Sequence, residues 1–402
     1  MNAVGIDAAK GWSMVAVMRP FGEVVASPFE VTHTVEGLSE LVRFIKSLDG
    51  ETKSVVECTG SYHLSIARAL YDVGLHVSAV NPQLIHDYGD NTIRKRRSDK
   101  GAAIKIANYA LSNWLELPRY VPDEEIRQSL KAFSRQYNKY VKVKIMLTNN
   151  FISLLDQTFP GLKELFTSPA RKSDGHEKWL DFAKRFWHRD CVANMSLNAF
   201  AEAYRKWCKR SGYNCVSAAK IHAAARQCAA VMPKSDSTKV LITLAAAQVN
   251  AVCESLHTVA REMKRLAKML PEYDVVLAFR GVGEILGPQL MAEIGDVQRF
   301  SKKSSLVAFA GLEPTDNQSG KFQGDEKISK KGSPHLRKTL FQVMDCLLRT
   351  SPEDDPVYRL LDRKRAESKH YYSYMSAGSA KFLRIYYARV KAHLGTMEIS
   401  GE

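Results

Sequence analysis

The sequence lacks the features that mark secreted and membrane-anchored proteins. Its amino-terminal stretch, MNAVGIDAAKG, has an acid where a signal peptide needs a long apolar segment. The longest apolar runs, such as residues 240–252, are interrupted by polar residues and are too short to span a bilayer. No low-complexity tract or short-period repeat is present. We therefore expect an intracellular protein that does not act at a membrane.

Paired cysteines are also lacking. The seven cysteines are odd in number and form no CxxC pair, so reduced thiols are expected. Four of them lie between residues 191 and 228, with His188 and His222 nearby, but their spacing matches no common zinc template. Small buried thiols are the favoured interpretation.

Basic residues, by contrast, are abundant. The 402 residues include 58 Lys and Arg against 43 Asp and Glu, a net charge of +15. Such an excess favours a polyanionic partner, most often nucleic acid, over a basic but unrelated enzyme. The length predicts two or three domains.

Residues 1–118 are predicted to form an α/β domain. Strands are expected at residues 3–10, 13–20, 22–31, 53–60 and 76–82, and helices at 35–48 and 61–74. The order β-β-β-α-β-α-β, followed by a helix, is typical of the ribonuclease H-like fold, although other α/β orders stay open.

The rest of the chain is predicted to be helical. Periodic apolar residues indicate one long helix after residue 120 and another at about 238–270. The two could form an antiparallel coiled coil within a region 119–270, with residues 157–236 as a helical insertion at its tip. Four large aromatics of the insertion have basic neighbours, but we expect them in a core rather than stacked on bases: Trp179, Trp187, Tyr204 and Trp207.

Residues 271–402 are expected to form a third, mainly helical unit. The GVG at 281–283 is typical either of a helix-hairpin-helix element, whose backbone N–H groups bind phosphate, or of a turn that ends a helix. The stretch HYYSYM at 370–375 could supply a tyrosine nucleophile, but helix packing is the more natural interpretation.

Two acids interrupt strands that are otherwise apolar. Asp7 lies within GIDAAK and Glu57 within SVVECTG, where an isolated charge is costly. On neighbouring strands of a ribonuclease H-like sheet they would lie side by side and would need a cation between them. Magnesium or manganese suits such oxygen ligands. Asp99 could complete the set, or it could simply cap a helix together with Ser98.

Several cations and one serine are candidates for nucleic-acid chemistry. The run Arg94, Lys95, Arg96 and Arg97 precedes Asp99 and could bind a nucleic-acid backbone, although such a run is often only a solvated loop. Ser319 lies in a polar loop and could be a nucleophile if cations neutralise the phosphate, although Ser-Gly is common in turns. The expected cations that follow this serine are Lys330, Lys331, Arg337 and Lys338.

Taken together, these motifs resemble a known family. GIDAAK, VVECTGSYH, the SDK segment after the basic run, and the block GVG…AFAGLEP…SG…ISKKG…LRK are similar to the DEDD transposases of bacterial insertion sequences. This is the Piv/MooV-related, bridge-RNA-guided family, insertion-sequence family one-ten. The match covers about residues 1–115 and 275–345.

The resemblance implies a function in DNA recombination. The amino-terminal domain would be RuvC-like, with Asp7, Glu57 and Asp99 binding magnesium, and the carboxy-terminal domain would be the transposase domain, with Ser319 attacking a DNA phosphodiester to give a covalent intermediate. The implied partners are donor and target DNA, a structured guide (bridge) RNA and three further copies of the chain in a tetramer. The implied location is the bacterial cytoplasm, in association with the nucleoid. The fold class expected overall is α/β plus all-α.

One position departs from the family pattern D-x-x-D-A. Ala102 stands where the resemblance places a fourth acid, one helical turn after Asp99. Either the protein dispenses with this ligand or an Asp has been replaced to prevent cleavage, and we favour replacement. Two alternatives to the recombinase stay open: a RuvC-like metal-dependent junction nuclease that uses water instead of serine, and a non-catalytic nucleic-acid-binding protein.

Overall fold

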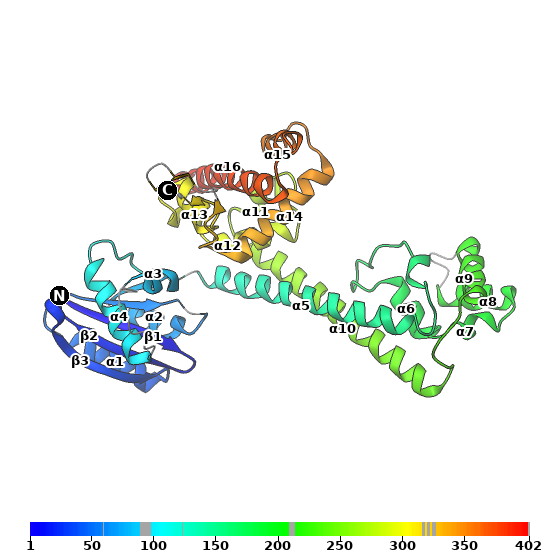
Figure 1. Ribbon diagram of the computed structural model, residues 1–402, viewed down its shortest axis with the longest axis horizontal. Helices are drawn as coiled ribbons and strands as arrows, with labels where there is room; N and C mark the ends of the chain where they lie inside the picture. The colour runs from blue at the N-terminus through cyan, green and yellow to red at the C-terminus, as the bar shows by residue number, and fades with distance from the viewer. Residues whose placement is uncertain are drawn as a thin grey trace. The chain divides into compact units, whose positions relative to one another are not determined.

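The computed structural model describes the chain except residues 59, 89–97, 123, 209–213, 316–317, 320–321, 324–326 and 401–402. The chain divides into two compact units, Met1–Asp123 and Glu124–Glu402. Each unit has hydrophobic cores of its own, and the elements are labelled in Figure 1.

The first unit contains a mixed five-stranded sheet in the order β3-β2-β1-β4-β5. Its strands are β1 (Asn2–Ala9), β2 (Trp12–Met18), β3 (Val24–Thr32), β4 (Thr52–Glu57) and β5 (His76–Val80). Strand β2 is antiparallel to its neighbours β1 and β3, whereas β4 is parallel to both β1 and β5. The expected order of strands and helices is confirmed, with one short unexpected helix, α3 (Pro82–Asp87), after β5.

Helices cover both faces of this sheet. Alternate residues of β1 separate the two cores, as the two-residue period of a strand requires. Val4 and Ile6 pack with α1 (Val35–Lys46) and α2 (His63–Asp72), whereas Ala3 on the opposite face packs with α4 (Asp99–Ser112).

A glycine sets how closely α4 approaches the sheet. A Cβ added at Gly5 would lie 2.1 Å from the carbonyl oxygen of Ala103 and 2.4 Å from the backbone nitrogen of Ala107. Only a residue without a side chain fits between β1 and this helix. Because Asp7 lies two residues after Gly5, it lies on the same face of β1 as α4.

Two long helices begin the second unit, α5 (Glu125–Leu155) and α10 (Asp236–Ala267). They run antiparallel: Leu130 of α5 shares a core with Val259 and Met263 of α10, whereas Phe151 shares another with Ile242. Figure 1 shows the two helices side by side. Residues 156–235 connect α5 to α10. The coiled coil and the helical insertion at its tip stay predictions.

By length and composition alone, α10 could also cross a membrane, because an 18-residue window within it has a mean hydropathy of 1.3. The apolar run at 240–252 is therefore part of a longer candidate span than the sequence suggested. This is weak evidence, since the core helix of a soluble protein passes the same test. Residues such as Ile242, Ala246 and Val249 pack in the core shared with α5.

The segment between these helices forms a core rich in aromatic residues. Its helices are α6 (Lys178–Arg185), α7 (Asp190–Ala193), α8 (Leu197–Trp207) and α9 (Cys215–Gln227), with a 3-10 turn η2 (Lys163–Leu165). Trp179, Trp187 and Tyr204 are buried and Trp207 is half-buried, all within or against one core. The prediction that these rings pack inside is confirmed.

The remainder of the second unit is mainly helical and includes four short strands, β6 to β9, which we call the β arm. Its helices are α11 (Tyr273–Leu277), α12 (Leu286–Ile294), α13 (Lys303–Phe309), α14 (Pro334–Thr350), α15 (Pro356–Ala366) and α16 (Tyr371–Ser400).

Gly281 lies between α11 and α12 at a positive φ of 76°, and a Cβ there would lie 3.1 Å from the carbonyl oxygen of Val343. The GVG motif thus occupies a tight turn between two helices.

The stretch HYYSYM only partly fits the expectation of helix packing. Met375 is fully buried and Tyr374 half-buried, but Tyr371 and Tyr372 are exposed by 40% and 62%. Tyr372 nevertheless contacts Phe341 of α14, and the Tyr371 hydroxyl donates a hydrogen bond to Asp345 of the same helix, so both tyrosines pack against a helix while they stay exposed.

Candidate functional site: an acidic cluster and a serine-bearing arm

Asp7 of β1 and Glu57, the last residue of β4, lie side by side on neighbouring parallel strands. The paired residues Ile6 of β1 and Val56 of β4 immediately precede them, so both acids follow in register. Residues in register on parallel strands face the same side of a sheet, which here is the side covered by α4. The sequence-based expectation that these two acids are neighbours agrees with this register.

The electrostatics of Asp7 indicate that Asp99 is close as well. Partial burial, with the nearby carboxylates of Glu57 and Asp99, raises the pKa of Asp7 to about 6. Asp99 is exposed at the first turn of α4, whose cap is Ser98: the Ser98 Oγ accepts a hydrogen bond from the Gly101 N–H at 3.2 Å. Because Ser98 provides the cap, capping does not account for Asp99.

The acidic cluster has the donor chemistry for a hard divalent cation but not a closed ligand set. A carboxylate whose charge is disfavoured by two neighbouring carboxylates, as that of Asp7 is, is what an oxygen-binding cation would stabilise. Among the described residues, however, no group of three or more His, Cys, Asp or Glu is arranged closely enough to hold a metal ion. Ala102 lies half-buried one turn after Asp99 and contributes no oxygen.

The basic run before Asp99, Arg94 to Arg97, lies outside the described residues. Its expected contact with a nucleic-acid backbone stays a prediction.

Ser319 belongs to the β arm of the second unit. Strand β6 (Pro314–Thr315) pairs with β9 (Lys327–Ile328), and β7 (Gln318–Ser319) pairs with β8 (Phe322–Gln323). Ser319 is opposite Phe322 in the second pair. The serine therefore belongs to a pair of short antiparallel strands rather than to a helix.

The base of this arm is held by two glycines and an arginine. Gly311 has a φ of 65°, and a Cβ on Gly332 would lie 2.3 Å from the carbonyl oxygen of Phe309. The Nη1 of Arg337 donates hydrogen bonds to the carbonyl oxygens of Ala310 at 2.8 Å and Gly332 at 3.2 Å. Arg337 therefore ties the two sides of the arm together, whereas Lys330 and Lys331 beside it are exposed.

Sequence reasoning missed a polar network next to the arm. Glu293 of α12 is only 2% exposed and accepts two hydrogen bonds from the guanidinium of Arg135, at 3.1 and 3.3 Å. Ser333, the cap of α14, also contacts this carboxylate at 3.4 Å. The signal was present, because Glu293 interrupts the apolar run LMAEIG as Asp7 interrupts its strand.

Cations surround this network. Burial and the cations Arg135, Lys338 and Lys142 lower the pKa of His335, although Glu293 acts in the opposite direction. Burial, and then Lys142, lowers the pKa of Lys338, whose Nζ donates a hydrogen bond to the Asn138 Oδ1 at 2.6 Å. Positive charge thus gathers where α5 meets the beginning of α14.

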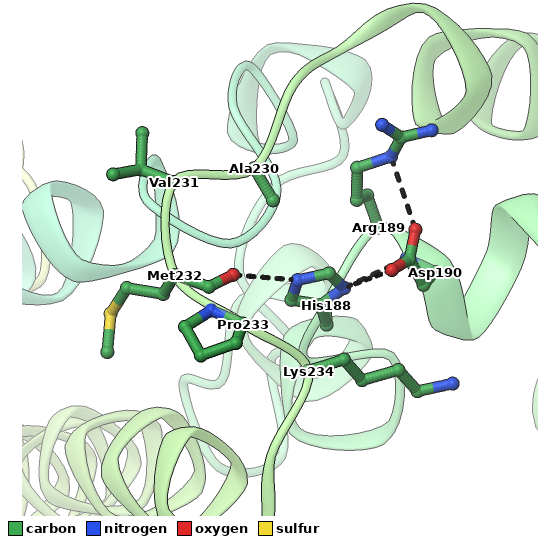
Figure 2. Close-up of a pocket in the computed structure, with 8 residues that line it drawn as sticks. All are labelled: His188, Arg189, Asp190, Ala230, Val231, Met232, Pro233 and Lys234. Carbon is green, nitrogen blue, oxygen red and sulfur yellow. Dashed lines mark hydrogen bonds and ion pairs between the residues drawn. The ribbon is translucent and has the colours of Figure 1, made fainter.

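A cavity of about 300 Å³ lies elsewhere, between residues 188–190 and 230–234 (Figure 2). Both ring nitrogens of His188 are engaged there: Nδ1 accepts from the Asp190 N–H at 3.1 Å, and Nε2 lies 3.1 Å from the Met232 carbonyl oxygen. His188 therefore ties two segments together and is not poised as a metal ligand.

Two family models match the chain, one on each side of the insertion. A model for DEDD transposases of the IS110 type covers residues 4–160, which include the acidic cluster, and a model for the IS116/IS110/IS902 family of transposases covers residues 273–359, which include Ser319. The chain belongs to the IS110-type transposases. The resemblance stated from the motifs is thereby confirmed.

Relatives of this transposase match along most of its length. A Streptomyces coelicolor protein named after the mini-circle element IS117 is 25% identical over 79% of this chain and 77% of its own. The pilin gene-inverting protein of Moraxella bovis is 20% identical over 77% of this chain and 72% of its own. A solved Thermus thermophilus RuvC structure matches 30% of this chain and 100% of its own, with 14% identity and a TM-score of 0.24.

Proposed function

We propose that this transposase is an RNA-guided DNA recombinase that cuts and rejoins donor and target DNA through a covalent serine–DNA intermediate. The observation that carries the proposal is the convergence of Asp7, Glu57 and Asp99, which raises the pKa of Asp7 to about 6. An acid whose pKa is raised by burial and by specific charged neighbours is a candidate for a functional site. Family membership supports DNA as the substrate.

The first unit serves as a RuvC-like domain of the ribonuclease H type in this proposal. The strand order β3-β2-β1-β4-β5 supports it, as does the position of the acids on β1, β4 and the first turn of α4. Asp7, Glu57 and Asp99 would supply oxygen ligands to a magnesium or manganese ion once they are drawn closer together than they lie in this structure. When bound, the ion would polarise a phosphodiester and stabilise charge in its displacement.

The segment 271–402 supplies the nucleophile. The Ser319 Oγ forms a bond to phosphorus, the bond from phosphorus to a deoxyribose oxygen breaks, and that oxygen leaves as a hydroxyl after taking up a proton. The serine proton passes to a base. One phosphodiester is exchanged for another, so the reverse attack can rejoin DNA without an external energy source.

Cations next to the arm would position the DNA backbone. Lys330 and Lys331 are exposed beside Gly332, and Lys338 is exposed on α14. Arg337 acts differently in this proposal, since its hydrogen bonds hold the arm itself. The guide RNA, the tetramer and a nucleoid-associated place in the bacterial cytoplasm follow from the resemblance and belong to the same proposal.

Trapping the intermediate tests this function. The chain carrying Ala102→Asp is purified with its RNA and incubated with magnesium and a supercoiled plasmid that bears the insertion element. A protein–DNA adduct is expected on a denaturing gel. It should disappear with Ser319→Ala and persist with Ser329→Ala, a serine at the other side of the same arm.

The other outcomes separate the alternatives. Cleavage without an adduct would identify a junction nuclease that uses water. Binding without any magnesium-dependent cleavage would identify a non-catalytic protein. Sequencing the RNA that purifies with the chain tests guidance, because the absence of a discrete RNA species contradicts it.

A further inference from the structure

A row of exposed aromatic rings lies where α16 begins, against α14. The ring of Tyr372 contacts those of Phe341 and His370, with centroid distances of 6.3 and 5.6 Å and interplanar angles of 32° and 31°. Tyr371 packs edge-on against Tyr372 at 5.3 Å. His370 is exposed and Tyr372 is 62% exposed, so the outer rings of this row face solvent.

This exposure contrasts with the other aromatic cluster of the second unit. Trp179, Phe182, Phe200 and Tyr204 are each at most 3% exposed and fill a core. Tyr371 and Tyr372 have no comparable cover within the described residues. Large exposed aromatic groups that gather in one place typically mark a binding surface rather than a packing element.

One face of α14 extends this row as a polar stripe. Lys338, Gln342, Asp345 and Arg349 are spaced by three or four residues, so they lie on one side of the helix. From Lys338 to Arg349 this side is roughly 16 Å long at 1.5 Å per residue. The Asp345 carboxylate accepts a hydrogen bond from the Tyr371 hydroxyl at 3.2 Å, so this acid orients a ring. The stripe therefore has a cation near each end and rings beside its middle.

The cations at the beginning of α14 exceed the acid available to them. Among the described residues, Glu293 is the acid that acts on His335 in this cluster, and its oxygens are engaged by Arg135 and Ser333. Lys338 lies near Lys142 of α5 and is hydrogen-bonded to a neutral amide, that of Asn138. An excess of positive charge beside exposed rings complements a polyanion that also has aromatic groups.

We propose that this surface binds an unpaired DNA strand, with nucleobases stacked on Tyr372 and His370 and phosphates near Lys338 and Arg349. Duplex DNA keeps its base faces within its own stack, so the rings would discriminate for unpaired bases. DNA is the assigned nucleic acid because the chain belongs to a family of DNA transposases. The inference does not depend on the metal site or on Ser319.

Binding of short oligonucleotides tests this assignment. The full chain is titrated against fluorescent oligo-dT of about 20 nucleotides and against a duplex of equal length, with anisotropy as the readout. Tyr372→Ala should weaken single-strand binding by about fivefold or more, the lower end of the contribution from one base–aromatic stack, and should change duplex binding by less than about twofold. Tyr372→Trp should retain single-strand binding, because the larger ring still stacks.

Matched controls make each result decisive. Phe21 is a fully exposed ring of the first unit, and Phe21→Ala should leave oligo-dT binding unchanged. Because Tyr372 is mostly exposed, the circular dichroism of Tyr372→Ala should match that of the parent.

Equal losses for single strand and duplex, or no loss for either, would overturn the stacking role. Tighter, Tyr372-dependent binding of oligo-rU would overturn the assignment to DNA in favour of RNA.

Discussion

Asp7 occupies a position that disfavours its own charge. Its carboxylate is partly buried and faces two others, and the pKa near 6 is the measure of that unfavourable environment. Residues that destabilise a fold in this way are typical of sites that a ligand completes. The free energy held at this residue should therefore be visible in the stability of the protein without any metal.

Replacing Asp7 should stabilise the first unit above pH 6. The pKa of this group is higher in the folded chain than its ordinary value of 3.8. The carboxyl therefore costs no folding free energy below about pH 4, where it is protonated in both states, and its cost grows between pH 4 and pH 6 and is complete above pH 6. Asp7→Asn should raise the unfolding free energy by about 1–2 kcal/mol at pH 7.5, after a discount for solvent screening, and by nearly nothing at pH 4.

Urea unfolding in the absence of divalent ions, followed by hydrogen exchange of β1 peptides, measures this difference. Glu57→Gln should give a smaller change in the same direction, because Glu57 is a lesser cause than burial. A stabilisation by Asp7→Asn that is equally large at pH 4 would show that the carboxylate charge is not its source.

Ala102 is the second residue with a direct consequence for activity. An acid at this position would stand one turn after Asp99 on the same side of α4 and would add an oxygen donor to the cluster. Ala102→Asp is expected to raise magnesium-dependent strand cleavage by tenfold or more, whereas Ala102→Asn, which lacks the charge, should raise it far less. Equal plasmid cleavage by the parent and Ala102→Asp would remove a fourth ligand from the mechanism.

At the scale of elements, the site depends on how closely α4 approaches β1. A methyl group on Gly5 would collide with backbone atoms of Ala103 and Ala107, which cannot rotate away. Gly5→Ala should therefore destabilise the first unit by about 1–3 kcal/mol and displace Asp99 from Asp7. Thermal unfolding measures the loss. Gly283→Ala is the matched control, since no atom lies within 4 Å of its added Cβ, and it should be neutral.

Elements with a strong local signal were the ones that the sequence predicted. The strands, α1 and the two long helices follow from apolar periodicity and caps such as Thr34, whose Oγ1 accepts a hydrogen bond from the Gly37 N–H. The acids were found because they interrupt apolar strands. The Arg135–Glu293 pair was not predicted from the sequence, because its two residues are 158 positions apart and only the fold brings them together. The exposure of Tyr371 and Tyr372 was missed for the same reason, because it depends on how these residues pack against α14, which is distant from them in the sequence.

At the scale of the whole molecule, the two units should respond differently to a divalent ion. The acidic cluster lies entirely within Met1–Asp123, while Glu124–Glu402 carries Ser319. A ligand that binds only the folded first unit stabilises that unit alone, by about 1.4 kcal/mol at ten times its dissociation constant.

Calorimetry of the full chain should show two transitions, and manganese should raise the midpoint temperature of only one of them. Hydrogen exchange of β1 identifies that transition as the unfolding of the first unit. Ala102→Asp should enlarge the shift and Asp7→Asn should abolish it. A shift of both transitions together, or one that survives Asp7→Asn, would place the ion elsewhere and contradict the proposed metal site.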